Sequence, residues 1–104
     1  MKTITVQELK AKKDGNEEFQ LIDVREPHEV EICTIDGLNL PMGEIMDTMD
    51  QIRKDIPVIV HCRSGKRSAA VISTLEMYGY ENLHNLTGGI LAYADEVDTS
   101  LEKY

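Results

Sequence analysis

The amino-acid sequence predicts an α/β protein whose central, mostly parallel, five-stranded sheet is covered by helices on both faces. Short apolar segments alternate along most of the chain with segments whose apolar residues recur every three or four positions, as in successive strands and helices. Val58, Ile59 and Val60 form a run of β-branched residues, which is typical of a parallel strand buried on both faces. The 104 residues suit one domain, residues 1–104, with its own core.

The first third of the chain predicts two strands, each followed by a helix. Residues 3–5 suit a short edge strand. Thr5 and Glu8 have the spacing of a capping box, which predicts a helix from there to about residue 13. Residues 19–24 indicate a buried strand, and Pro27 is placed for the first turn of a helix that ends near residue 32 or 33.

The middle of the chain predicts a short strand, a helix and the central strand. Residues 37–41 indicate a turn and a short strand that ends at a proline. Residues 43–52 are polar and methionine-rich, and they predict one helix. Its core-facing side chains are expected to be Ile45, Met46, Met49 and Ile52. The strand at residues 58–60 then leads to Cys62 and a short polar loop that contains Gly65.

The last third predicts a helix, a strand and a second helix. From about residue 68 to residue 78 the apolar positions follow helical spacing, with Val71, Leu75 and Tyr78 on one face. Gly79 lies where the helix should end. Residues 82–86 suit a strand, and residues 87–89 turn into a helix from residue 90 to about residue 97. Residues 98–104 are polar and either extend that helix or fray.

The charge distribution favours a small anion as the ligand. The formal net charge is -8, which disfavours nucleic acid and anionic membrane surfaces as partners. Yet Arg63, Lys66 and Arg67 place three of the eleven Lys and Arg residues beside Cys62. A local positive site in an acidic protein is explained better by a small anion than by a polyanion.

The cysteine and histidine pattern disfavours both disulfides and metals. Cys33 and Cys62 show no paired spacing, and no apolar run resembles a membrane span or an export signal. We therefore expect reduced thiols and a cytoplasmic protein. His28, His61 and His84 are scattered along the sequence, so we expect no metal site and no cofactor.

The position of Cys62 predicts a reactive thiol. It lies at the carboxyl end of a strand, and the loop after it leads to the amino end of a helix, where unpaired N–H groups and a partial positive charge favour anions. With three basic residues nearby, such surroundings lower a thiol pKa from about 8.5 to roughly 3.5–7.5. A buried cysteine beside a solvated basic turn is the simpler alternative, but the combined context favours a nucleophile.

The length of the loop identifies the family that the chain resembles. Protein tyrosine and dual-specificity phosphatases have His-Cys, five residues and then Arg, whereas here Arg67 follows Cys62 after only four residues. The six residues Cys-Arg-Ser-Gly-Lys-Arg, 62–67, closely resemble the active loop of rhodaneses, which are sulfurtransferases. Residues 21–25, 35–41 and 87–93 also resemble rhodanese landmarks, with Tyr93 in place of the usual tryptophan.

The resemblance implies a rhodanese-like fold and sulfur transfer through a Cys62 persulfide. The thiolate would take sulfur from a small anionic donor, thiosulfate, and pass it to a thiophilic acceptor such as cyanide, a thiol or a carrier protein. The loop residues expected to bind the donor are Arg63, Ser64, Gly65, Lys66 and Arg67. Asp23 and Arg25 are expected to pair below the loop as supporting residues.

Two other functions compete with sulfur transfer. A phosphatase or arsenate reductase of the Cys-loop type is disfavoured by the missing loop residue. A non-catalytic rhodanese-like binding or regulatory module is disfavoured because such versions usually lose the cysteine. His61 is expected to be a core histidine with satisfied hydrogen bonds rather than a proton-transfer group. Cys33 is expected to be simply buried, with a redox role only if it approaches Cys62. The oligomeric state and the physiological donor and acceptor do not follow from the sequence.

Overall fold

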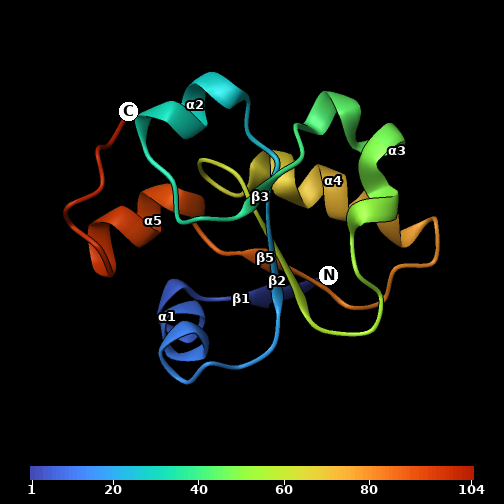
Figure 1. The fold of residues 1–104 in the computed structure, drawn as a ribbon, viewed down its shortest axis with the longest axis horizontal. Coiled ribbons are helices and arrows are strands. Elements are labelled where there is room, and N and C mark those ends of the chain that lie inside the picture. The colour runs from blue at the N-terminus through green and yellow to red at the C-terminus, as the bar shows by residue number, and fades with distance from the viewer.

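The computed structural model describes all residues, 1–104, and contains one five-stranded sheet in which every neighbouring pair of strands is parallel. The strands are β1 (Lys2–Ile4), β2 (Gln20–Asp23), β3 (Leu38–Asn39), β4 (Val58–His61) and β5 (Leu83–Leu86). Their order across the sheet is β1-β5-β4-β2-β3, so β4 is the central strand (Figure 1). The predicted α/β class and the parallel five-stranded sheet are confirmed.

The fold also contains five α-helices and two short 3-10 helices, of which α5 follows the last strand. The α-helices are α1 (Val6–Asp14), α2 (Pro27–Ile32), α3 (Ile45–Thr48), α4 (Lys66–Glu76) and α5 (Gly89–Glu96). The 3-10 helices are η1 (Met42–Glu44) and η2 (Met49–Gln51). The predicted capping box starts α1, because the Thr5 hydroxyl accepts from the Glu8 N–H and the Glu8 carboxylate accepts from the Thr5 N–H. No helix is long and apolar enough to cross a bilayer.

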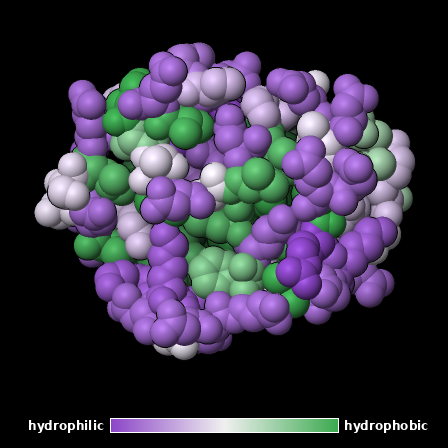
Figure 2. Space-filling view, in the orientation of Figure 1, coloured by the Kyte–Doolittle hydropathy of each residue, from purple (hydrophilic) through white to green (hydrophobic).

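The core consists of two clusters, one on each face of the sheet. The first cluster packs α3 and α4 against the strands, and the second packs α1 and α5 against the opposite face (Figure 1). Side chains alternate along β4, so Val58 and Val60 enter the first cluster while Ile59 enters the second. Burial on both faces is why this strand is apolar without alternation. Outside the core, hydrophilic side chains cover most of the molecular face in Figure 2.

The single helix predicted at residues 43–52 is wrong. The segment is divided into η1, α3 and η2, with only one turn of α-helix. Ile45 and Ile52 are buried, and Met49 packs on the first cluster, whereas Met46 is 46% exposed. One residue along a helix rotates the side chain by about 100°, so a single turn that buries Ile45 and Met49 directs Met46 away from the core.

The prediction that Tyr78 lies on the core face of α4 is also wrong. The helix ends at Glu76, and Tyr78 is 52% exposed. The chain turns at Gly79, and the N–H of Tyr80 donates to the carbonyl of Leu75. Tyr80 is therefore the aromatic residue that enters the core, and its hydroxyl donates to the Met49 carbonyl at 2.7 Å. Residues 98–104 do not extend α5, because Leu101 and Tyr104 pack against the second cluster.

Candidate active site

Cys62 lies at the carboxyl edge of the sheet, directly after the central strand. Strand β4 pairs with β2 on one side and with β5 on the other, which fixes the position of its end. The chain then passes through residues 62–65 into α4, whose N-cap is Gly65 with a φ of 104°. Only 1% of Cys62 is exposed. The predicted arrangement of strand, tight loop and helix is therefore present.

The N–H group of Gly65 is directed toward the Cys62 sulfur and donates to Sγ at 3.1 Å. The amides of Ser64 and Ser68 also help to lower the pKa of the Cys62 thiol. The carbonyl groups point the other way, toward the first turn of α5. There the N–H of Ile90 donates to the Cys62 carbonyl at 3.0 Å and that of Leu91 to the Arg63 carbonyl at 3.1 Å. Helix α5 thus holds the loop in its anion-binding orientation.

Gly89 permits the close contact between α5 and the loop. A Cβ atom at this position would lie 2.4 Å from the Arg63 carbonyl oxygen and 2.7 Å from the Cys62 carbonyl oxygen. Gly89 also has a φ of 61°, in the left-handed region that favours glycine. The glycine pair at residues 88–89, which the sequence indicated only as a turn, therefore shapes the site directly.

Hydrogen bonds lower the pKa of the Cys62 thiol. Burial by itself raises the pKa of the Cys62 thiol, but bonds from the Ser68 hydroxyl and from the amides of Ser68, Gly65 and Ser64 bring the pKa below its ordinary value. These donors stabilise the charged sulfur more than the basic side chains do. The lowered pKa was expected, but the sequence reasoning assigned it mainly to the three charges and the helix terminus.

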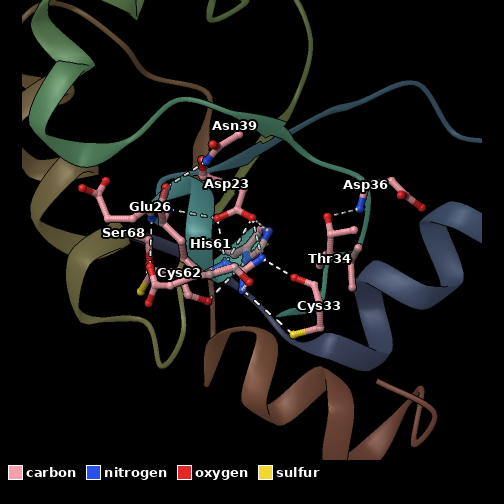
Figure 3. A network of polar contacts seen from close by, with 12 residues as sticks. Asp23, Glu26, Cys33, Thr34, Asp36, Asn39, His61, Cys62 and Ser68 are labelled. Atoms are coloured by element: carbon pink, nitrogen blue, oxygen red, sulfur yellow. Dashed lines mark hydrogen bonds and ion pairs between the residues drawn. The ribbon is translucent and has the colours of Figure 1, made fainter. Parts of the chain in front are cut away.

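Ser68 and Asn85 complete the surroundings of the sulfur. The Ser68 hydroxyl lies 3.5 Å from Cys62 Sγ and 2.6 Å from Asn85 Oδ1, and Figure 3 shows Ser68 beside Cys62. The amide nitrogen of Asn85 donates to the Gly65 carbonyl at 3.1 Å. Sequence reasoning missed both residues as site residues. Asn85 is a polar residue within the predicted strand at 82–86, but nothing in the sequence places that strand beside the central one.

The three basic side chains of the loop have different surroundings. Arg67 forms a bidentate pair with Glu29 of α2, at 2.7 and 2.9 Å, and this pairing lowers the pKa of Glu29 to about 2. Arg63 packs over the ring of Tyr104, 5.0 Å from its centroid, and donates to the Tyr104 main-chain oxygen. Lys66 has no ion pair or hydrogen bond from its side chain and is exposed. Lys66 is therefore the one cation of the three without a partner.

Asp23 and Arg25 form the predicted pair below the loop. Both side chains are fully buried, and Arg25 Nη2 lies 2.7 Å from Asp23 Oδ2. Burial opposes the charge of Arg25, but its bonds to Asp23 and Tyr104 keep its pKa above the ordinary value. Arg25 also donates to the carbonyl groups of Glu29 and Cys33. The pair thereby fixes the end of β2 to the interior and the C-cap of α2.

His61 is buried beside this pair, but its hydrogen bonds are incomplete. Nδ1 lies 3.3 Å from the Cys62 carbonyl oxygen, whereas Nε2 has no hydrogen-bond partner and lies 3.7 Å from Asp23 Oδ2. Burial lowers the pKa of His61, which favours the neutral ring. Figure 3 shows the imidazole next to Asp23. The expected core position is confirmed, but the expectation that both ring nitrogens are satisfied is wrong.

Cys33 and Cys62 lie on opposite faces of the sheet. Cys62 belongs to the first cluster and Cys33 to the second, and both are free thiols. The Cys33 sulfur lies 4.0 Å from Arg25 Nη1, while Asp23 and His61 lie between the two cysteines in Figure 3. Cys33 therefore does not approach Cys62, which was the condition for a redox role.

Comparison with known proteins agrees with the fold. The rhodanese-like domain profile matches residues 5–96. A protein named sulfurtransferase from Allochromatium vinosum is 39% identical over 88% of this chain and 86% of its own length. The rhodanese-like/PpiC domain-containing protein 12 of Arabidopsis thaliana is 36% identical, and the chain spans only 38% of it. A rhodanese-like domain protein of Staphylococcus aureus has a TM-score of 0.84 with 33% identity, covering 100% of this chain and 99% of that one.

Proposed function

The chain belongs to the rhodanese-like domain family, and from this we propose that it is a sulfurtransferase that carries sulfur as a persulfide on Cys62. The names of its relatives support sulfur transfer in general. The observation that carries the proposal is the 3.1 Å hydrogen bond from the Gly65 N–H to Cys62 Sγ, within a ring of amides around the sulfur. Such a ring stabilises both a thiolate and the terminal sulfur of a persulfide.

The proposed reaction has two displacement steps. The Cys62 thiolate attacks the outer sulfur of thiosulfate, a new S–S bond forms, and the original S–S bond breaks as sulfite leaves with its electron pair. A thiophilic acceptor then attacks the outer sulfur of the persulfide, and the Cys62 thiolate is released. The sulfur thus passes through a covalent enzyme intermediate in ping-pong order. The acceptor is cyanide in an assay, and a thiol or a sulfur-carrier protein in the cell.

The loop residues have distinct proposed roles. The amides of Ser64 and Gly65 bind the reacting sulfur, and Lys66 attracts the anionic donor because its charge has no partner in the protein. Arg63 and Arg67 add positive charge from fixed positions. Asp23 and Arg25 support the site from below through the buried pair at the end of β2. We also propose that the protein works in the cytoplasm, where both thiols stay reduced.

Intact mass spectrometry after incubation with thiosulfate tests the proposal. We expect a gain of about one sulfur atom that is lost on adding cyanide, because the persulfide is the covalent intermediate. Cys62→Ser should show no gain, and Cys33→Ser, the matched control, should gain as much as the natural protein. A gain in Cys62→Ser would place the sulfur elsewhere. No gain in the natural protein with any sulfane donor would favour a binding module.

Hydrolysis of a phosphate ester distinguishes the rival phosphatase function from sulfur transfer. The loop has four residues between Cys62 and Arg67, one fewer than phosphatases use. Its ring of amides is therefore too small to surround a tetrahedral phosphate. We therefore expect no hydrolysis of an aryl phosphate by the natural protein. Insertion of one glycine after Gly65 should widen the ring and lower sulfur transfer. Turnover of the phosphate ester by the unmodified chain would favour the phosphatase reading.

A further inference from the structure

Tyr104 contacts several charged groups around the candidate site. Its hydroxyl accepts a hydrogen bond from Arg25 Nη1 at 2.9 Å and lies 3.4 Å from Glu29 Oε1. The Arg63 guanidinium packs over its ring, 5.0 Å from the centroid. Glu29 in turn holds Arg67. One tyrosine therefore touches Arg63 directly and reaches Arg67 through Glu29.

The fold fixes the segment that carries Tyr104. The Asp98 carboxylate accepts bonds from the N–H and the hydroxyl of Ser100, which turns the chain back toward the sheet after α5. Leu101 and Tyr104 then pack against the second cluster, and Lys103 pairs with Asp95. The position of Tyr104 beside Arg63 is therefore set by several contacts along residues 98–104.

The contact leaves part of the Arg63 guanidinium free. Nη2 donates to the Tyr104 main-chain oxygen, and the guanidinium carbon lies over the Tyr104 ring. The Arg63 side chain makes no other hydrogen bond. The N–H groups of Nε and Nη1 therefore stay available to a ligand. An arginine held in this way loses less conformational freedom on binding an anion than a free side chain does.

We propose that Tyr104 is a positioning residue that holds Arg63 at the rim of the Cys62 loop and thereby favours anionic reactants over neutral ones. This role of Tyr104 concerns which reactants the site selects by charge. It rests on the proposed function only for the identity of the sulfur donor. Tyr104 acts through Arg63, whose guanidinium then offers its remaining N–H donors to the anion approaching the Cys62 sulfur.

Alkylation of Cys62 with iodoacetate and with iodoacetamide tests this without any sulfur donor. The two reagents differ in charge, and the rate for each is read from the mass of the peptide that contains Cys62. We expect Tyr104→Leu to lower the iodoacetate rate about three- to tenfold, as the loss of a cation–π contact at the site would give, and to leave the iodoacetamide rate unchanged. Tyr104→Phe, which keeps the ring under Arg63, should stay within about twofold of the natural protein for both reagents.

A second variant separates positioning from a general loss of structure. Arg63→Gln should lower the iodoacetate rate by itself, and Tyr104→Leu should have no further effect in that background.

With thiosulfate, Tyr104→Leu should raise KM and leave kcat unchanged. The inference would be overturned if Tyr104→Leu lowered the rates of both reagents equally, left the iodoacetate rate unchanged or raised it. It would also be overturned if Tyr104→Phe lowered the iodoacetate rate as much as Tyr104→Leu does, or if Tyr104→Leu lowered it further in the Arg63→Gln background. If the natural protein forms no persulfide but shows the expected alkylation pattern, only the proposed sulfur transfer fails.

Discussion

The Ser68 hydroxyl has one proton and two acceptors, the Cys62 sulfur at 3.5 Å and the Asn85 side-chain oxygen at 2.6 Å. It donates to one of them at a time, and the shorter distance favours Asn85 while the sulfur is neutral. A negative charge on the sulfur makes it the better acceptor, since hydrogen bonds to ionised groups are stronger. The hydroxyl can thus respond to the charge of the sulfur without moving the backbone.

Removing this hydroxyl should make Cys62 less acidic. We expect Ser68→Ala to raise the pKa of the Cys62 thiol, because the Ser68 hydroxyl is the largest of the contributions that lower it. The pH dependence of the iodoacetamide rate reports this pKa, and the rate at neutral pH should fall. Ser64→Ala is the matched control, since Ser64 contributes through its amide and should leave the profile in place. Equal profiles for Ser68→Ala and the natural protein would contradict the assignment.

Gly89 is the residue at which a single methyl group should disrupt the site. Gly89→Ala places a Cβ 2.4 Å from the Arg63 carbonyl oxygen. The left-handed backbone alone costs roughly 1–2 kcal/mol, and the clash adds to it. We expect a lower free energy of unfolding in urea and slower alkylation of Cys62. Gly43→Ala, where nothing lies within 4 Å of the added Cβ, should change stability by about 0.5 kcal/mol or less. Similar effects of the two substitutions would show that α5 and the loop adjust freely.

At the scale of elements, the buried pair of Asp23 and Arg25 joins β2 to α2. Helix α2 has only six residues and cannot be stable alone, so its position depends on contacts with neighbouring elements. Arg25 bonds to the Asp23 carboxylate at the strand end and to carbonyl groups of Glu29 and Cys33 in and after the helix. This arrangement places Glu29 where it holds Arg67 of α4.

Breaking this pair on one side should be costly. We expect Arg25→Met to lower the free energy of unfolding by about 3–5 kcal/mol, because the Asp23 carboxylate is left buried without its partner. The double variant Asp23→Leu with Arg25→Met should recover part of that loss. Arg53→Met removes an exposed pair with Asp55 and should change stability by about 1 kcal/mol or less. Urea denaturation compares the three, and a small effect of Arg25→Met would show that water or another cation replaces the arginine.

Helical segments illustrate which parts of the fold could be predicted. The first helix has a complete capping box within its own sequence, and it formed where predicted. The segment at 43–52 has apolar residues at helical spacing, but no cap or strong local signal, and tertiary packing divided it. A helix with capping signals in its own sequence could therefore be predicted, whereas a segment whose conformation depends on contacts with distant residues could not.

The same distinction separates the predicted and the missed parts of the candidate site. Cys62 and its loop are contiguous, so their order along the chain was enough to indicate a thiol among anion-binding groups. Asn85 lies 17 positions from Ser68, and Tyr104 lies 41 positions from Arg63. These contacts depend on strand order, which the alternation of apolar segments does not determine. The Asp23–Arg25 pairing was predictable because the two residues are neighbours in sequence.

For the whole molecule, the Glu29–Arg67 pair should make stability depend on acid pH. The pKa of Glu29 falls from an ordinary 4.5 to about 2 in the folded protein, mainly through its bonds to Arg67. A carboxylate with a lowered pKa stabilises the fold fully above its unfolded pKa, and this contribution is lost as the pH falls toward the folded value. The window is therefore about pH 4.5 down to about pH 2.

Replacing Glu29 should remove this part of the pH dependence. We expect Glu29→Gln to be less stable than the natural protein at neutral pH by about 1–3 kcal/mol, and the difference should shrink between pH 4.5 and pH 2. Urea midpoints across this range measure it. Glu31→Gln is the matched control, since Glu31 is exposed on the same helix and should leave the curve unchanged. A constant difference between Glu29→Gln and the natural protein at every pH would mean that the carboxylate charge is not responsible.

The separation of Cys33 and Cys62 by the sheet also has a consequence under oxidative stress. Peroxide converts a thiolate to a sulfenic acid, which a neighbouring thiol normally captures as a disulfide before further oxidation. Cys33 cannot act in this way because it is buried on the other face. Capture of the sulfenic acid as a disulfide therefore requires a thiol from another molecule, and a sulfenic acid that is not captured is open to further oxidation to the irreversible sulfinic acid. The lifetime of the protein under oxidants should thus depend on the small-molecule thiols around it.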